Sequence, residues 1–206
     1  NPLEGLALRG QIISMADAIL RDSQRTGRST ACLVLQFDQA DHVVEQHGRV
    51  AQTEVLIRSA ERICGALRAG DIVARLEGGG FAVALAPARR FDVETVVQVA
   101  ARLQAAIAAP ISLNATNIYA TCSVGLCLGD RAPTASGLGL LNAAQVAADE
   151  ALRHGPSAIR AFSQDMARNR ADRDALREEL EVALDEGQIR PYFQPQTSTH
   201  TGEITG

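Results

Sequence analysis

Three consecutive glycines, Gly78 to Gly80, mark the point where the backbone of this chain could come closest to a ligand. They follow Glu77 and precede Phe81, and the apolar runs on both sides predict a hairpin turn. Glycine accepts the positive φ angles that let peptide N–H groups surround a phosphate. No helix is predicted directly after the turn, which excludes a dinucleotide-binding or P-loop motif. A tight turn without a ligand is the simpler interpretation, and both remain open at this point.

The basic side chains exclude several kinds of chemistry, because all 20 are arginine and none is lysine. A P-loop lysine, a Schiff-base lysine and a Ser–Lys dyad are therefore absent. The formal net charge of −4 and the aromatic content of 3% argue against nucleic acid as a partner. We interpret the histidines, which have no partner at metal-ligand spacing, as ordinary surface or hydrogen-bonded residues: His42, His47, His154 and His200.

The cysteines indicate the cellular compartment of the protein rather than a metal-binding or disulfide site. There are four, with no C-x-x-C pair among them: Cys32, Cys64, Cys122 and Cys127. Each lies in an apolar run, so we predict buried free thiols in a reducing cytoplasm. The sequence has no signal peptide and no run of about 18 apolar residues, and we predict no membrane contact within this segment. Because it starts without Met and stops abruptly, we expect it to be part of a longer protein.

Hydrophobic periodicity predicts the elements that must position these residues. Helical spacing predicts helices over residues 12–20, 41–47, 55–67, 93–107, 138–153 and 165–186. Gly27 and Gly70 are the expected stops of the first and third helices, and Asp92 is the expected cap of the fourth. Apolar runs predict strands over residues 31–37, 71–76, 81–86, 117–128 and 157–162. Together they predict an α+β fold, a mixed sheet flanked by helices, with strand 31–37 central and 77–80 as an exposed hairpin turn.

Four segments in this order resemble the GGDEF domain, the diguanylate cyclase fold, in a degenerate form. Asn1–Arg9 resembles the family opening D-x-L-T-G-L-x-N-R, and Arg75–Phe81 stands where R-x-G-G-D-E-F belongs. Ser123–Gly125 matches the S-I-G strand, and Ala147–Gly155 occupies the A-D-x-A-L-Y helix. The resemblance covers residues 1–163 and implies a ferredoxin-like palm of the nucleotide cyclase type, acting in bacterial cyclic di-GMP signalling.

The departures from the family pattern concern its metal ligands. Family cyclases join two GTP molecules by attack of a 3′-hydroxyl on an α-phosphate, with Mg²⁺ held by carboxylates. The resemblance places the first metal carboxylate at Gln36. It places the acidic pair of the signature, whose first member is a second metal ligand, at Gly79 and Gly80, so none of the three positions is acidic here. We interpret the nearby acids as structural, Asp38 as a strand-end cap and Glu77 as a solvated turn carboxylate. The resemblance thus implies no catalytic residue, no bound Mg²⁺ and no other metal site.

The nucleotide positions of the family have changed as well. The resemblance places the guanine-contacting Asn and Asp at Val44 and Thr53, and the phosphate-binding lysines at Asp41 and Leu152. Because ligands of the metal, the base and the phosphates are all replaced, we predict that this chain makes no cyclic di-GMP.

One family motif is retained. Arg68 and Asp71 have the spacing from the glycine turn that the inhibitory R-x-x-D site for cyclic di-GMP has in the family. The guanidinium fork matches the O6/N7 edge of guanine, and a carboxylate accepts from its N1–H and N2–H₂ edge. The alternative is an arginine at a helix end and an aspartate at a strand entry. A second R-x-x-D, Arg89 to Asp92, is interpreted as a chance match.

The C-terminal part resembles the opening of an EAL domain, the cyclic di-GMP phosphodiesterase module. Tyr192–Pro195 matches Y-x-Q-P, and Thr201–Gly206 matches T-G-x-I-x-G. We therefore divide the chain into a degenerate GGDEF domain (1–163), a linker helix (164–187) and the truncated start of an EAL domain (188–206).

These resemblances predict a regulatory module that is not itself an enzyme. It would bind cyclic di-GMP or GTP, adjoin an EAL domain and form a homodimer. The alternative is a scaffold or dimerisation segment of a parent protein that acts as a cyclic di-GMP phosphodiesterase.

Overall fold

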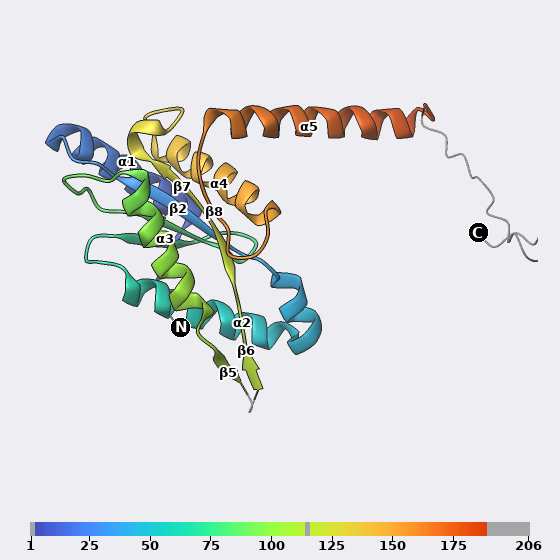
Figure 1. Cartoon of the computed structure of the whole chain (residues 1–206), viewed down its shortest axis with the longest axis horizontal. Helices are drawn as coiled ribbons and strands as arrows, with labels where there is room; N and C mark the ends of the chain where they lie inside the picture. The colour runs from blue at the N-terminus through green and yellow to red at the C-terminus, as the bar shows by residue number, and fades with distance from the viewer. Residues whose placement is uncertain (1–2, 114–115, 189–206) are drawn as a thin grey trace, which may run out of the picture. The chain divides into compact units, whose positions relative to one another are not determined.

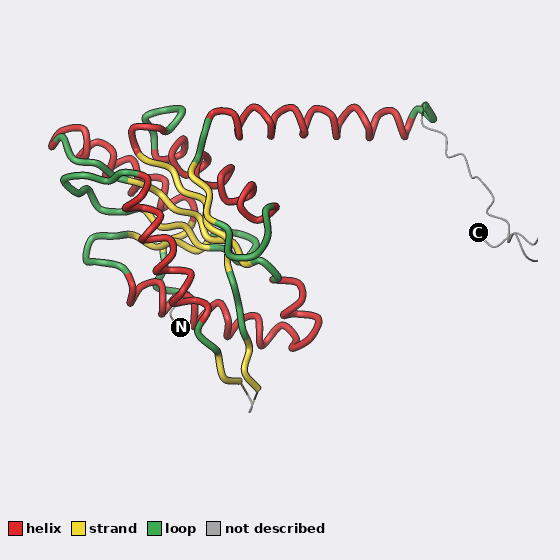
Figure 2. Tube along the Cα trace, viewed as in Figure 1, coloured by secondary structure: helices red, strands yellow, loops and turns green. Residues whose placement is uncertain are grey.

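The structure is a computed structural model that describes residues 3–113 and 116–188. A six-stranded sheet lies between helices (Figures 1 and 2). Its strands are β1 (Ala7–Leu8), β2 (Ala31–Phe37), β3 (Ile72–Arg75), β4 (Phe81–Ala84), β7 (Cys122–Leu128) and β8 (Ile159–Ala161). A separate hairpin is formed by β5 (Ile111–Leu113) and β6 (Thr116–Ile118). The α-helices are α1 (Arg9–Thr26), α2 (Ala40–Ala66), α3 (Val93–Ala108), α4 (Gly137–Arg153) and α5 (Gln164–Asp185), and a short 3₁₀ helix, η1 (Gly129–Arg131), follows β7.

The sheet is mixed, with the strand order β1-β3-β4-β2-β7-β8. The outer pairs β1–β3 and β7–β8 are parallel, and the three inner pairs are antiparallel. Strand β2 lies inside the sheet between β4 and β7, as its unbroken apolar run predicts. The α+β class with a mixed sheet flanked by helices is therefore confirmed.

The core has two layers, because alternate side chains of β2 point to opposite faces of the sheet. Leu33 and Leu35 belong to the layer that α2 and α3 cover, whereas Cys32 and Val34 belong to the layer under α1 and α4. All four side chains are almost completely buried. This double coverage holds the β3–β4 turn and the end of β2 at one edge of a rigid sheet.

Local signals set several element boundaries as predicted. Helix α1 is followed by Gly27 in the left-handed conformation, with φ of 64°. Helix α3 is capped by Asp92, whose carboxylate accepts from the Thr95 amide at 2.9 Å. Helix α2 contains a break at Gly48, where φ is 80° and ψ is 173°. The two helices predicted over 41–47 and 55–67 are thus the two segments of α2, before and after Gly48.

Two predictions about apolar runs are wrong. The run 117–128 is not one strand, because β6 pairs with β5 and only β7 joins the sheet. Ile118 packs with Val55 in a small satellite cluster, so its burial comes from α2 rather than from the sheet. Cys64 is exposed, because it follows the buried Ile63 on α2 and falls on the outer side of that helix.

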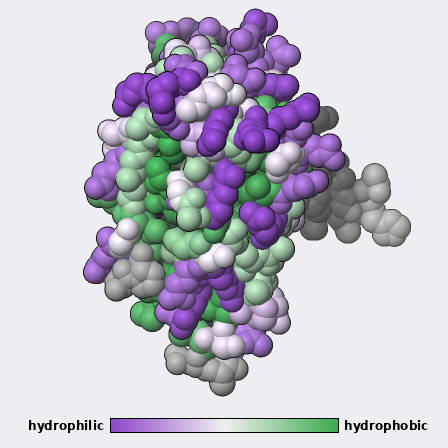
Figure 3. Space-filling model, turned by 90° about the vertical axis from the view of Figure 1, so that its left-hand side faces the viewer, coloured by the Kyte–Doolittle hydropathy of each residue, from purple (hydrophilic) through white to green (hydrophobic). Residues whose placement is uncertain are grey.

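The chain divides into two compact units, residues 1–167 and 168–206. In the second unit, the apolar side chains that recur on α5 are exposed: Leu176, Leu180 and Leu184. The predicted EAL opening at 188–206 lies, apart from Gln188, outside the described residues, and the division 1–163, 164–187 and 188–206 stays a prediction. No helix in the described part of the chain is long and apolar enough to cross a membrane. On the face shown in Figure 3, hydrophobic surface lies between hydrophilic side chains.

Candidate functional site

The β3–β4 turn is built so that only glycine fits its tip. Gly78 and Gly79 have φ angles of 83° and 90°, a region in which other residues are strained. A Cβ atom added to Gly80 would lie 2.7 Å from the carbonyl oxygen of Leu35, which is closer than a Cβ atom comes to another heavy atom without a shift of the backbone. The turn is closed by the Leu76 amide, which donates to the Gly80 carbonyl at 2.9 Å. Acidic side chains at positions 79 and 80 would therefore require a different backbone here.

The two residues that flank this tip differ in their exposure to solvent. Glu77 is exposed at the start of the turn. Phe81 is fully buried and meets Phe37 edge to face, with the ring centroids 6.2 Å apart. The turn is thus anchored to the end of β2 through an aromatic pair, next to position 36.

Gln36 is engaged by a carboxylate on α4. Its side-chain Nε2 donates to Oδ1 of Asp149 at 2.9 Å, and Nε2 of Gln145 donates to the same oxygen at 2.8 Å. The other end of the amide, Oε1 of Gln36, is buried and accepts no hydrogen bond from the described residues. The sequence places a neutral residue here, but only the structure shows that this amide ties β2 to α4.

Asp38 holds three segments together at the end of β2. Its carboxylate accepts from Oγ of Ser123 on β7 at 2.5 Å and from the backbone amide of Ser157 at 3.0 Å. Both oxygens are therefore used inside the protein. This geometry agrees with the predicted role of Asp38 as a strand-end cap.

Arg68 and Asp71 lie together, and their polar groups are used within the chain. Nε of Arg68 is 3.3 Å from Oδ1 of Asp71, and Asp71 also accepts from the backbone amides of Arg68 at 3.1 Å and Ala86 at 2.8 Å. Arg68 also donates to the Ala86 carbonyl and stacks over Phe91, with the guanidinium carbon 5.2 Å from the ring centroid. The Asp71 side chain is 3% exposed and that of Arg68 49%. The arrangement connects the end of α2 to the segment after β4.

Two of the nucleotide positions suggested by the resemblance lie on one side of the first segment of α2. Asp41 and Val44 line a shallow depression together with Glu45, Arg49 and Gln52. Two of these five side chains carry negative charge and one carries positive charge. Thr53 donates its hydroxyl to the Arg49 carbonyl at 3.0 Å. Leu152 lies on α4 and is 39% exposed.

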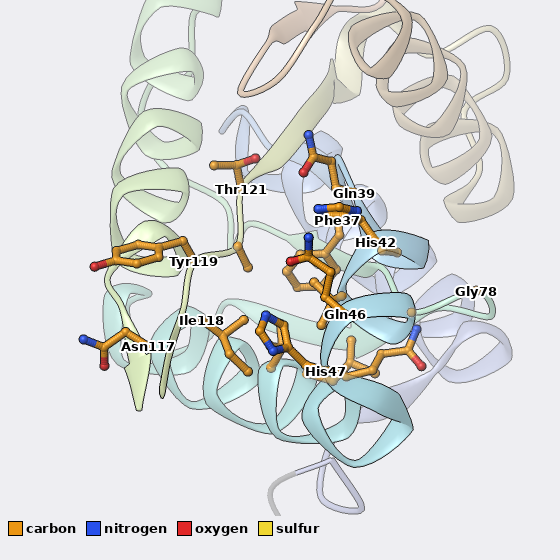
Figure 4. A pocket seen from close by; sticks show the side chains of 17 residues that line it. Phe37, Gln39, His42, Gln46, His47, Gly78, Asn117, Ile118, Tyr119 and Thr121 are labelled. Atoms are coloured by element: carbon orange, nitrogen blue, oxygen red, sulfur yellow. The ribbon is translucent and has the colours of Figure 1, made fainter. Parts of the chain in front are cut away.

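A second cavity lies on the other side of the first segment of α2. It has a volume of about 270 Å³ and is bounded by that segment, the tip of the β3–β4 turn and residues 117–121. Its apolar walls are formed by Phe37, Val43, Val55, Leu56, Ile118 and Ala120. In Figure 4, Gln46 and His47 extend toward Ile118, whereas Asn117 and Tyr119 point away. We call this space the α2–β6 cavity.

Sequence reasoning about single histidines missed this cavity. His42 and His47 were expected to be isolated, and the structure places both at its rim. The spacing of His42 and Gln46, four residues apart on a helix, indicates a shared face and could have signalled the grouping. His154 lies elsewhere, with Nδ1 2.8 Å from the Glu150 carbonyl, and His200 is outside the described residues. Across residues 3–113 and 116–188, no three histidine, cysteine or acidic side chains gather into a metal-binding group.

Comparison with known proteins gives one family. The family model described as diguanylate cyclase, GGDEF domain, matches residues 2–158. The solved GGDEF domain of TpbB from Pseudomonas aeruginosa superposes with a TM-score of 0.75 at 28% identity, covering 82% of this chain and 96% of that one. A sensory box/GGDEF family protein from Caulobacter crescentus gives a TM-score of 0.69 at 26% identity, covering 75% and 98%. These neighbours share the palm architecture seen here.

Two curated relatives align over nearly the whole chain. An uncharacterized signaling protein from Caulobacter vibrioides is 26% identical over 99% of this chain and 25% of its own length. The cyclic di-GMP phosphodiesterase NbdA from Pseudomonas aeruginosa is 25% identical over 99% of this chain and 26% of its own length. The chain thus spans about a quarter of the length of these relatives.

Proposed function

The chain belongs to the GGDEF domain family of diguanylate cyclases, and we propose that this member is a regulatory domain without cyclase activity. The observation that carries the proposal is the set of side chains around the β3–β4 turn. Where the family pattern has a metal-binding carboxylate and the acidic pair of the signature, this chain has the amide of Gln36 and the two glycines 79 and 80. Cyclase chemistry needs those carboxylates to hold the ion that neutralises charge on the reacting phosphate.

The donor set at the turn does not fit Mg²⁺. This ion prefers carboxylate oxygens in a near-octahedral arrangement. Gln36 offers one buried amide oxygen, and its nitrogen is committed to Asp149. Gly79 and Gly80 offer no side chain, and the contact of Gly80 with Leu35 leaves no room for one. These features support the proposal that the turn binds no magnesium ion.

The charge next to the first segment of α2 also disfavours GTP. The depression that contains Asp41 and Val44 also contains Glu45, and only Arg49 opposes these two carboxylates. A triphosphate placed there would meet negative charge at the position where the family pattern has a lysine. This supports loss of substrate binding as well as loss of the metal.

The direct test is an assay of the purified chain with GTP and Mg²⁺. We expect no cyclic di-GMP above a control without protein, while an active cyclase of the family gives product under the same conditions. Calorimetric titration with GTP and Mg²⁺ should give no heat of specific binding. Chromatographic detection of cyclic di-GMP made by this chain would refute the proposal.

The ligand that we propose for the regulatory role is cyclic di-GMP, bound at Arg68 and Asp71, on the face away from the β3–β4 turn. Its support is that the two side chains are adjacent and Arg68 is half exposed. The Asp71 carboxylate must then exchange or share its contacts with the amides of Arg68 and Ala86 when it accepts from guanine. This requirement predicts a local rearrangement after β4 on binding.

Substitution of Arg68 tests this site. Each charge-assisted contact contributes about 1.5–3 kcal/mol, so Arg68→Ala should weaken binding of cyclic di-GMP by about tenfold or more. Binding should raise the melting temperature of the parent chain with ligand concentration. Arg89→Ala is the matched control, since Arg89 belongs to the chance motif. The proposal fails if both variants bind cyclic di-GMP with the affinity of the parent chain. It also fails if cyclic di-GMP does not change the melting temperature of the parent chain. We would then propose a domain that acts only through contacts with other proteins.

A second candidate function is a scaffold or dimerisation segment of a longer phosphodiesterase. It is favoured by the alignment with NbdA, which is named a cyclic di-GMP phosphodiesterase and matches 99% of this chain. Under this proposal the parent protein contains an EAL domain after this segment, hydrolyses cyclic di-GMP, and keeps that activity in the Arg68→Ala variant. A change in its hydrolysis rate with Arg68→Ala would favour the regulatory function. Sedimentation of this chain would show whether it forms the predicted homodimer.

A further inference from the structure

Two cysteines lie directly opposite each other on neighbouring strands of the sheet. Strands β2 and β7 are antiparallel neighbours (Figure 1), and their register pairs Cys32 with Cys127. Both side chains are buried in the hydrophobic layer under α1 and α4, so they point to the same face of the sheet. Cys122 belongs to the opposite layer, as expected for a residue an odd number of positions before Cys127 on the same strand. The fold therefore brings together two thiols that are far apart in the sequence.

The hydrogen bonds at the two ends of the β2–β7 ladder define the geometry of this cysteine pair. The Gly129 amide donates to the Thr30 carbonyl at 2.8 Å, and the Asp38 amide donates to the Thr121 carbonyl at 3.0 Å. Hydrogen-bonded pairs alternate along an antiparallel ladder, so the cysteines also form such a pair, with Cα atoms about 5.5 Å apart. A disulfide joins Cα atoms that are about 4.4–6.8 Å apart. The backbone separation therefore already suits a covalent bond between the two sulfur atoms.

Closing this bond requires only a small movement of the two strands. Opposite Cβ atoms of an antiparallel pair lie about 4.5–5.5 Å apart, whereas a disulfide holds its Cβ atoms about 3.5–4.5 Å apart. The two Cβ atoms would thus have to approach each other by about 1 Å. A bond formed in this way carries strain, and strained disulfides are reduced more easily than unstrained structural ones. The arrangement is typical of a reversible modification rather than of a permanent crosslink.

We propose that Cys32 and Cys127 are a redox-modification site, which becomes an intramolecular disulfide when a peroxide oxidises the folded chain or a small disulfide oxidises it during folding. With hydrogen peroxide, one thiol attacks a peroxide oxygen and gives a sulfenic acid and water. The second thiol attacks the sulfenic sulfur, forms the S–S bond and releases a second water. With oxidised glutathione, two exchange steps form the same bond and release two molecules of reduced glutathione. This inference does not rest on the proposed function, because it uses neither the turn nor Arg68 and Asp71.

The position of the two thiols, and not their individual reactivity, would make the modification selective. Burial raises the pKa of Cys32 and of Cys127 to about 12. Because the thiolate is the reactive form, the first oxidation step is slow, and the exposed Cys64 reacts sooner with reagents in solution. Once either buried sulfur is oxidised, the partner thiol lies directly opposite it. The second step is then intramolecular and strongly favoured over reaction with any other thiol.

Peptide mapping by mass spectrometry after oxidation tests the proposal. A Cys64→Ser chain is oxidised in the folded state with hydrogen peroxide and, separately, is refolded from urea with oxidised glutathione at pH 8, so that access to buried thiols is not limiting. In both samples, peptides joined through Cys32 and Cys127 should exceed every other pairing about tenfold or more. The control is oxidation in urea, where Cys122 and Cys127 should pair most often because they close the shortest loop.

Two matched substitutions in the same Cys64→Ser chain localise the bond. Cys32→Ala and Cys122→Ala each remove one buried thiol, but from opposite faces of the sheet. Cys32→Ala should lower the amount of intramolecular disulfide about tenfold or more, whereas Cys122→Ala should leave it unchanged. Circular dichroism before oxidation shows whether each variant folds, and the folded and urea-treated Cys64→Ser samples decide the question without them.

Two results would overturn the proposal. One is a Cys64→Ser chain in which Cys32 and Cys127 stay unlinked after both oxidation of the folded state and oxidative refolding. The other is a folded chain that gives the same mixture of pairings as the chain in urea, since the fold would then not direct the reaction.

Discussion

At the residue scale, the decisive substitution is the neutral amide at position 36. A carboxylate at a metal site needs a cation to balance its negative charge. The side-chain amide of Gln36 is neutral, and its Nε2 donates a hydrogen bond to Asp149. Because Gln145 donates to the same oxygen, the Asp149 carboxylate is surrounded by amides from two elements. The Gln36 amide and the Asp149 carboxylate therefore join β2 to α4 in this chain.

We predict that Gln36→Asp destabilises the fold instead of restoring a metal site. The new carboxylate, on a side chain one methylene shorter, would replace the amide that donates to Asp149, and two neighbouring carboxylates in this partly buried place cannot both ionise freely. The folded variant should retain a proton that the unfolded chain has released, so its stability relative to the parent falls as pH rises from 5 to 8. We expect a deficit of about 1–3 kcal/mol at pH 8.

Urea unfolding at pH 5 and pH 8 measures this effect. Gln36→Asn is the matched control, because it shortens the side chain equally but adds no charge. Parallel pH dependence of the Asp and Asn variants would show that charge at position 36 plays no part.

The thiols differ in environment more than their sequence contexts suggest. Burial raises the pKa of Cys32 to about 12, with a smaller contribution from Cys127. Burial likewise raises the pKa of Cys122 and of Cys127 to about 12, with smaller contributions from neighbouring charges. Cys64 is exposed, although partial desolvation raises its pKa as well. Of the four thiols, only that of Cys64 is exposed to solvent.

We predict that one thiol per chain reacts in the native state. A thiol-specific disulfide reagent at pH 8 should modify Cys64 and leave the other three unmodified until urea unfolds the protein. Native Cys64→Ser should then show no rapid reaction. A count of two or more fast thiols in the parent would mean that the inner strands open more readily than their burial indicates.

At the scale of elements, an arginine on α2 holds the end of α3. Nη1 of Arg62 donates to the carbonyls of Ile107 at 3.0 Å and Ala109 at 2.5 Å, and Nη2 donates to that of Pro110 at 2.9 Å. These carbonyls lie at or just after the C-terminus of α3, where helical partners are missing and the helix dipole is negative. Arg62 thus stabilises the neighbouring helix, although its sequence position suggests a contact with the end of its own.

We predict that Arg62→Ala lowers the free energy of unfolding by about 2 kcal/mol, because the three charge-assisted hydrogen bonds that the Arg62 guanidinium donates are lost. Arg58→Ala is the control on the same helix. Among the described residues, Arg58 pairs with Glu54 and Glu61 at the solvent-exposed surface, so its loss should destabilise the fold far less than the loss of Arg62. Urea unfolding of both variants tests the difference, and equal losses would argue against the role given to Arg62.

At the scale of the whole molecule, the buried core lies within the first compact unit. Every residue of the three hydrophobic clusters falls between Leu3 and Ala167. Strand β8 completes that unit, since it pairs with β7, and the Phe162 amide donates to the Leu126 carbonyl at 2.7 Å. The hydrophobic core of the described residues is therefore contained in that unit.

We predict that a chain of residues 1–167 melts within about 3 °C of the full chain, because it keeps the entire core. A chain ending at residue 153 should instead melt much lower or fail to fold cooperatively, since it lacks β8 and the buried Phe162. Circular dichroism during heating compares the three lengths. A large loss in the 1–167 chain would show that the second unit stabilises the first.

The sequence by itself determined those features of this protein that depend on neighbours along the chain. The break at Gly48, the stop at Gly27 and the cap at Asp92 follow from what single residue types do to local backbone. The double-sided burial of β2 follows from its unbroken apolar run. The mixed sheet and the glycine turn could be predicted from the order of these elements along the chain. The family could be predicted from the order of its sequence motifs.

Only the tertiary structure decided which partners those residues meet. The run 117–128 reads as one strand, but Ile118 packs against α2 and leaves the sheet. The amide of Gln36, the carboxylate of Asp71 and the rim of the α2–β6 cavity each depend on groups from distant segments. Periodicity indicates which side of an element is apolar, but the neighbour that covers it depends on how elements pack in three dimensions.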